Sequence, residues 1–112
     1  RLGDRLVIGL NSDASVKRLK GDARPINNEQ DRAEMLSNLA MVDGVAIFEE
    51  DTPAEILSIL RPNILVKGGD YKPDEVIGGE FVDKVLILPF REGYSTTGII
   101  ERIKQLVQEG KL

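Results

Sequence analysis

The sequence of 112 residues contains no cysteine, no histidine and no tryptophan. The absence of cysteine excludes disulfide bonds, cysteine-rich zinc sites and thiol nucleophiles. The absence of histidine removes the most common general base and the most common metal ligand of proteins. Chemistry based on imidazole within this stretch is therefore excluded.

Excess positive charge and long apolar runs are also missing. The 15 Lys and Arg residues and 19 Asp and Glu residues give a net charge of −4, which argues against nucleic-acid binding because that function needs a basic face. Apolar runs such as residues 85–89 are too short to span a bilayer, and no signal-peptide pattern opens the chain. We therefore expect a cytoplasmic protein with no nucleic-acid partner and no membrane partner.

The first residues resemble the end of a helix. Arg1 would lie in the last turn of that helix and Gly3 would form its C-cap, directly before an apolar segment. Because a helix that ends at residue 2 needs a body upstream, we expect a domain that is truncated at its N-terminus.

The rest of the chain alternates short apolar segments with segments of helical periodicity. Strands are expected at residues 6–10, 44–48, 64–67 and 85–89, the first of them buried on both faces. Helices are expected from about residue 28 to 42, after a capping box formed by Thr52 and Glu55, and from about residue 98 to 109. With hydrophobic residues at 41% and charged residues at 30%, this alternation predicts one α/β domain over residues 1–112, with a parallel sheet covered on both faces.

All three helices carry apolar residues at helical spacing, and in the last two the resulting stripe should be buried. The stripe of the helix after residue 52 consists of Ile56, Leu57 and Leu60, and that of the last helix of Ile99, Ile100, Ile103, Leu106 and Val107.

Ligands of parallel α/β sheets bind at the carboxyl ends of the strands. The segment after the first strand carries Asp13 and then four cations, Lys17, Arg18, Lys20 and Arg24. Such a segment suits a phosphorylated ligand, and a solvated charged loop is the alternative interpretation.

The start of the last helix is a second candidate anion site. Ser95, Thr96 and Thr97 place hydroxyl groups and free backbone N–H groups at this helix N-terminus. An ordinary N-cap is the alternative, and it needs only one of the three hydroxyls.

Two further features fit a charged ligand. The turn from Lys67 to Asp70 contains Gly68 and Gly69, which let the backbone approach a ligand closely, although such turns are also common punctuation. Arg32 lies in the first turn of its helix, where a cation opposes the helix dipole unless an anion or solvent offsets it. The residues therefore predict a parallel α/β domain that binds a phosphorylated ligand.

Several motifs occur in a distinctive order along the chain. These are NSDASVKRLKGDARP at residues 11–25, FEEDTP at 48–53, LVKGGDYKP at 65–73 and STT at 95–97. Together they resemble the D-glycero-β-D-manno-heptose 1-phosphate adenylyltransferases of bacterial lipopolysaccharide synthesis, which are cytidylyltransferase-like nucleotidyltransferases. The resemblance covers essentially the whole chain.

The resemblance implies a Rossmann-like parallel sheet of strand order 3-2-1-4-5. The first strand of that fold is its central one, and neither this strand nor the family's His-x-Gly-His signature is present here. Without it, the strands at 6–10 and 44–48 would be separated from those at 64–67 and 85–89. Because unpaired backbone groups in a sheet core are costly, we expect the 112 residues alone to be inactive and not independently stable.

The reaction that the resemblance implies is transfer of the adenylyl group of ATP to heptose 1-phosphate, giving ADP-heptose and pyrophosphate. Mg²⁺ would accompany ATP, no metal-ligating residue within this chain is implied, and the family suggests a homodimer. Catalysis of such a transfer depends on positioning the substrates and neutralising charge at the phosphates.

The resemblance also implies roles for single residues. Lys20 and Arg32 are expected to be catalytic. Tyr71 stands where cytidylyltransferase relatives have Trp, and Phe90 stands where they have Arg. The residues expected to bind substrate or nucleotide are Asp13, Lys17, Arg24, Lys67, Gly68, Gly69, Asp70, Tyr71, Ser95, Thr96 and Thr97.

Two other functions stay open. One is a cytidylyltransferase for another small phosphorylated alcohol, such as glycerol 3-phosphate, although the KRLKGD and KGGDY segments favour heptose. The other is a non-catalytic nucleotide-binding domain, which the absence of the histidines from the full gene product would favour.

Overall fold

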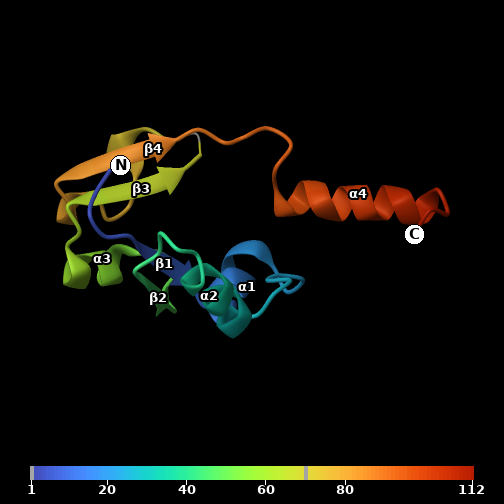
Figure 1. Cartoon of the computed structure of the whole chain (residues 1–112), viewed down its shortest axis with the longest axis horizontal. Helices are drawn as coiled ribbons and strands as arrows, with labels where there is room; N and C mark the ends of the chain where they lie inside the picture. Colours follow the sequence, from blue (N-terminus) through green and yellow to red (C-terminus); the bar gives the residue numbers. More distant parts are fainter. Residues whose placement is uncertain (1, 70) are drawn as a thin grey trace.

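A computed structural model describes residues 2–69 and 71–112 of the chain. All four strands lie within one residue of their expected bounds, so the α/β class is confirmed. In chain order the elements are β1 (Val7–Asn11), α1 (Asp13–Lys20), α2 (Glu29–Ser37), β2 (Gly44–Phe48), α3 (Ala54–Leu60), β3 (Ile64–Gly68), the 3₁₀ turns η1 (Pro73–Glu75) and η2 (Gly79–Phe81), β4 (Lys84–Leu88) and α4 (Thr96–Gln108) (Figure 1).

The strands form two separate parallel pairs. β1 pairs with β2 from Val7↔Gly44 to Asn11↔Phe48, and β3 pairs with β4 from Ile64↔Lys84 to Gly68↔Leu88. The parallel pairing is therefore confirmed, but over the described residues the strands form two two-stranded sheets and not one sheet. Within each pair both carboxyl ends lie at the same edge, where the predicted ligand segments follow.

The expected burial of the first strand on both faces is wrong. Val7 is 50% exposed, and Val66 and Leu88 of the other pair are 41% and 49% exposed. A two-stranded sheet that is covered on one side leaves half of its side chains open, because alternate residues point to opposite faces. The buried apolar core over the described residues is correspondingly small and consists of Phe48, Leu57 and Val76.

The basic segment after β1 is a helix and not the expected loop. The Ser12 side chain caps α1 by accepting a hydrogen bond of 3.1 Å from the backbone N of Ser15. Asp13 lies in the first turn, and Lys17 and Lys20 lie in the last turn. Both charges therefore complement the helix dipole, and these end signals stabilise a helix that has hardly any apolar stripe.

Two helix boundaries differ from the expectation. α2 begins next to the expected residue 28, with Asn28 as its N-cap, but it ends at Ser37, well before residue 42. The capping box of Thr52 and Glu55 does not form, because the first helical bond runs from Leu57 N to Pro53 O and places Pro53 at the cap position. Leu57 of α3 is buried as expected, whereas Leu60 is 49% exposed.

The helix end expected at residue 2 is also absent. Leu2 and Gly3 lie outside any helix, and Arg1 lies outside the described residues.

α4 extends away from both strand pairs (Figure 1). Its expected burial is wrong for Ile99, Ile103 and Val107, which are 46–62% exposed. Periodicity predicts the stripe, but burial needs a surface opposite, and within the described residues no element packs on this side of the helix.

Candidate phosphate-binding site

An ion pair and a hydrogen bond join the start of α2 to the start of α1. Nη2 of Arg32 lies 3.0 Å from Oδ1 of Asp13, and these side chains are 19% and 31% exposed. Nε of Arg32 also donates to the carbonyl oxygen of Asn27 at 3.0 Å, and the backbone N of Asp13 donates to Glu29 Oε1 at 3.2 Å. The anion that offsets Arg32 at the N-terminus of α2 is therefore the Asp13 carboxylate of the same chain.

Buried hydroxyl groups connect α1 to the end of β2. Ser15 is fully buried, and its Oγ donates to the carbonyl oxygen of Glu50 at 2.8 Å and accepts from Asn11 Nδ2 at 3.0 Å. The guanidinium of Arg18 binds Asp51 at 2.8 Å and the carbonyl oxygen of Glu49. Neither Ser15 nor Glu29 carries a local signal in the sequence, because their partners lie 35 and 16 residues away in the chain.

A hollow of about 300 Å³ opens beside Asp13. It brings together two of the predicted residues, Asp13 and Lys17. An ammonium group, carboxylates and amides around one space can hydrogen-bond the hydroxyl and phosphate groups of a small polar ligand. The lining residues are Asp13, Lys17, Pro25, Ile26, Asn27, Asn28 and Asp31.

The turn after β3 lies against the end of β4. The backbone N of Gly69 donates to the Leu88 carbonyl oxygen at 2.9 Å, and its φ of +126° favours glycine. Nζ of Lys67 lies 4.7 Å from the centroid of the Tyr71 ring. The predicted close turn at Lys67, Gly68 and Gly69 is therefore present, whereas Asp70 lies outside the described residues.

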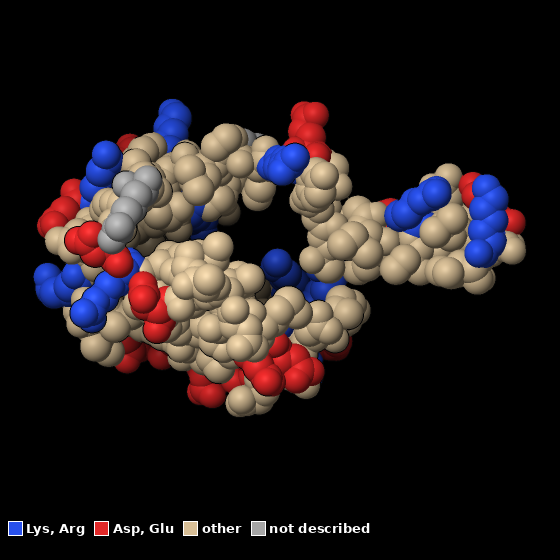
Figure 2. Space-filling model, viewed as in Figure 1, with Lys and Arg blue, Asp and Glu red and all other residues tan. Residues whose placement is uncertain are grey.

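The start of α4 contacts Arg24, which belongs to the basic segment that follows β1. Oγ of Ser95 accepts a hydrogen bond of 2.9 Å from Gly98 N, so Ser95 is the N-cap. Oγ1 of Thr97 accepts a hydrogen bond of 3.3 Å from Nη2 of Arg24, 73 positions earlier in the sequence. The surface is hollowed between the part of the molecule that contains β1 and β2 and the segment that connects β4 to α4 (Figure 2). Lys and Arg side chains reach into this opening (Figure 2).

The predicted residues thus fall into three groups. Asp13, Lys17 and Arg32 lie at the end of β1, Lys67 and Tyr71 at the end of β3, and Arg24 joins Thr97 at the start of α4. Lys20 is exposed in the last turn of α1. A helix N-terminus with a guanidinium beside it attracts anions.

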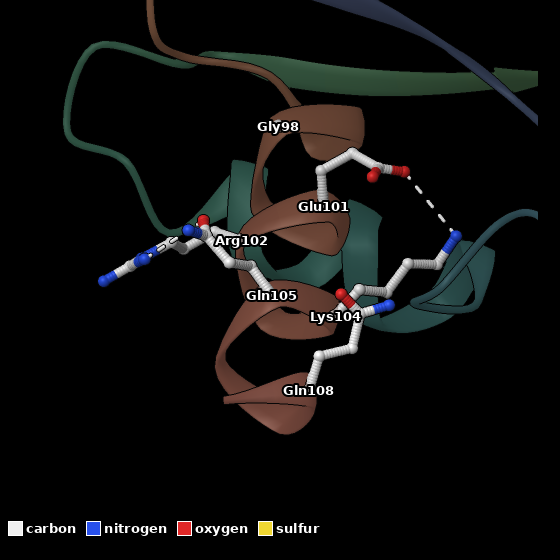
Figure 3. Close-up of a pocket in the computed structure, with 6 residues that line it drawn as sticks. All are labelled: Gly98, Glu101, Arg102, Lys104, Gln105 and Gln108. Carbon is white, nitrogen blue, oxygen red and sulfur yellow. Dashed lines mark hydrogen bonds and ion pairs between the residues drawn. The ribbon is translucent and has the colours of Figure 1, made fainter. Parts of the chain in front are cut away.

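A second hollow, of about 430 Å³, runs along the outside of α4 (Figure 3). Glu101 and Lys104 form an ion pair of 3.5 Å there, and Arg102 donates to Gln105 at 3.2 Å. A single helix supplies every lining residue, so this surface is a shallow, solvated face. These residues are Gly98, Glu101, Arg102, Lys104, Gln105 and Gln108.

The described residues contain neither a cluster of metal ligands nor a membrane-spanning helix. In residues 2–69 and 71–112 no group of three or more acidic side chains could hold a metal ion. The helices of the same residues are too short or too polar to cross a membrane.

Comparisons with known proteins agree on one family. The sequence profile described as cytidylyltransferase-like matches residues 1–102. The chain is 58% identical over 110 residues to the bifunctional protein HldE of Campylobacter concisus (strain 13826), covering 98% of this chain and 23% of that protein. It is 60% identical over 104 residues to the bifunctional protein HldE of Helicobacter pylori (strain Shi470), covering 93% and 22%. The chain thus spans less than a quarter of the length of these relatives.

Proposed function

Because the chain belongs to the cytidylyltransferase-like family and is therefore a nucleotidyltransferase domain, we propose that it transfers the adenylyl group of ATP to D-glycero-β-D-manno-heptose 1-phosphate. The products would be ADP-heptose, for lipopolysaccharide synthesis, and pyrophosphate. The observation that carries this proposal is the contact of Arg24 with Thr97 at the capped start of α4. It places a cation beside free helix N–H groups, where the phosphates of a nucleotide would bind.

The reaction needs no covalent enzyme intermediate. An oxygen of the sugar phosphate attacks the α-phosphorus of ATP, and the bond from that phosphorus to the bridging oxygen breaks as pyrophosphate leaves. Arg24 and the start of α4 would neutralise charge on the nucleotide phosphates, and Lys20 would do so at the reacting phosphate. Arg32 would act through Asp13, since its guanidinium holds that carboxylate.

Mg²⁺ fits this site only as a companion of the nucleotide. The described residues contain no acidic cluster that could hold a metal, and the Asp13 carboxylate is already paired with Arg32. Mg²⁺ commonly binds substrate phosphates with few protein ligands. When bound, it would add positive charge at the phosphates.

We also propose that one further strand, contributed by sequence outside these 112 residues, lies between β1 and β3. The two separate strand pairs support this arrangement, because each pair leaves edge N–H and C=O groups without a ladder partner. The resulting order, β2-β1-new strand-β3-β4, is the order 3-2-1-4-5 when counted from that strand. We propose further that the protein is a cytoplasmic homodimer and that residues 1–112 belong to a single domain.

The test is a pyrophosphate-release assay of the full natural protein that contains this chain. We expect turnover with ATP and heptose 1-phosphate and none with CTP and glycerol 3-phosphate. The reverse result would make the protein a cytidylyltransferase. Nucleotide binding without turnover of either pair would indicate a non-catalytic domain.

A variant pair sharpens this assay. Lys20→Ala should lower kcat at least about 10-fold, since removal of one charge-stabilising donor commonly costs 10²–10³. Lys104→Ala is the matched control, because Lys104 is an exposed lysine on the outer face of α4. Equal activity of the two variants would remove Lys20 from the proposed site.

A further inference from the structure

Most of the chain's few aromatic side chains are exposed on the segments that follow β3 and β4. Of its five aromatic residues, Tyr71, Phe90 and Tyr94 follow the carboxyl ends of β3 and β4 and are 47%, 69% and 72% exposed. Aromatic rings gain more free energy from burial than most side chains. A group of exposed rings at the edge where ligands bind therefore indicates a binding surface.

The side chains of Tyr71 and Phe90 both lie against the turn at Gly69. A methyl group built on Gly69 would lie 3.0 Å from Cζ of Phe90 and 3.1 Å from Cε2 of Tyr71, so both ring edges converge on this buried glycine. The hydrogen bond from Gly69 N to Leu88 O fixes the turn to the end of β4. Because the strand pairing positions both rings, little freedom would be lost when a ligand binds them.

Cations accompany this aromatic surface. Nζ of Lys67 lies 4.7 Å from the Tyr71 ring centroid, and Cζ of Arg91 lies 4.9 Å from that of Tyr94. Ser95, the cap of α4, directly follows Tyr94. A ligand that combines a flat ring with phosphate groups would find aromatic rings next to cations on these segments.

We propose that Tyr71 and Phe90 form the surface on which the nucleobase of the nucleotide stacks. This inference rests on the proposed function and deepens it by assigning the residues that select the base. A purine covers more aromatic surface than a pyrimidine, so the pair favours ATP over CTP.

The test compares a nucleotide with a ligand that lacks a base, in the full natural protein. Phe90→Ala should raise the Kd for ATP about 10-fold, within the range measured for loss of one base-stacking aromatic. The Kd for inorganic tripolyphosphate should not change. Phe90→Tyr should restore ATP binding, because it keeps the ring.

Ile59→Ala is the matched control, since Ile59 is a 74% exposed apolar residue on α3, outside the site; it should leave both Kd values unchanged. Equal weakening of ATP and tripolyphosphate by Phe90→Ala, or no weakening of either, would overturn the assignment. If Phe90→Ala weakens ATP alone but the wild-type protein transfers no adenylyl group, the base site stands and the proposed function fails.

Discussion

The two strand pairs of this molecule organise their carboxyl ends in opposite ways. At the carboxyl ends of β1 and β2 the polar side chains are buried or paired with one another: Ser15 is fully buried, and Asp13 is paired with Arg32. The end of β3–β4 is ordered by backbone contacts of Gly69 and leaves rings such as Phe90 exposed. The same parallel pairing thus supports two kinds of region. In one, the polar side chains pair with one another, and in the other, apolar rings are exposed to solvent.

This difference suggests that the two regions bind different parts of the substrates. Charged and hydroxyl groups at the β1–β2 end suit a sugar phosphate, whereas aromatic surface at the β3–β4 end suits a base. The contact between Arg24 and Thr97 is where the two regions meet.

The largest stability effect should come from the apolar core that supports the β3–β4 region. Leu57 is 6% exposed and would lie 2.4 Å, through its Cδ1, from a methyl group built on Gly78. Leu57→Ala should therefore lower the free energy of unfolding of the full protein by about 3 kcal/mol, measured by urea denaturation. Ile59→Ala, on the same helix but 74% exposed, should cost less than about 0.5 kcal/mol. Similar losses for the two would show that Leu57 is not a core residue.

A smaller effect should come from the polar closure of the β1–β2 region. Arg32→Ala should cost about 2 kcal/mol of unfolding free energy, because it leaves the partly buried Asp13 carboxylate without its partner. In a double-mutant cycle with Asp13→Asn, the two losses should be strongly non-additive. Additive losses would mean that the ion pair does not organise this end of the sheet.

Local sequence pattern was sufficient for the strands and insufficient for α1. Short apolar runs between polar segments marked all four strands, because apolar and β-branched residues favour strands. Five of the eight residues of α1 (Asp13–Lys20) are charged or polar, so the apolar spacing that marks a helix is weak there. Its signals were the Ser12 cap and the placement of charge at its two ends.

Contacts between distant residues could not be predicted from local pattern. The stripe of α4 was visible in the sequence, but its exposure depends on whether another element packs there. Glu29 holds the backbone of Asp13 across 16 positions, and Arg24 reaches Thr97 across 73. The candidate site was predicted at the strand ends because ligands of parallel sheets bind there, and the roles of single residues were predicted from the resemblance that the ordered motifs carry.

The most direct experiment asks whether one nucleotide contacts both regions. The measurement is the Kd for ATP of the full natural protein and of its Arg24→Ala, Thr97→Val and doubly substituted forms, by isothermal titration calorimetry. If both residues bind the same phosphate group, the losses should be non-additive by about 1 kcal/mol or more. Losses that add within about 0.3 kcal/mol would show two independent contacts and contradict a shared phosphate site.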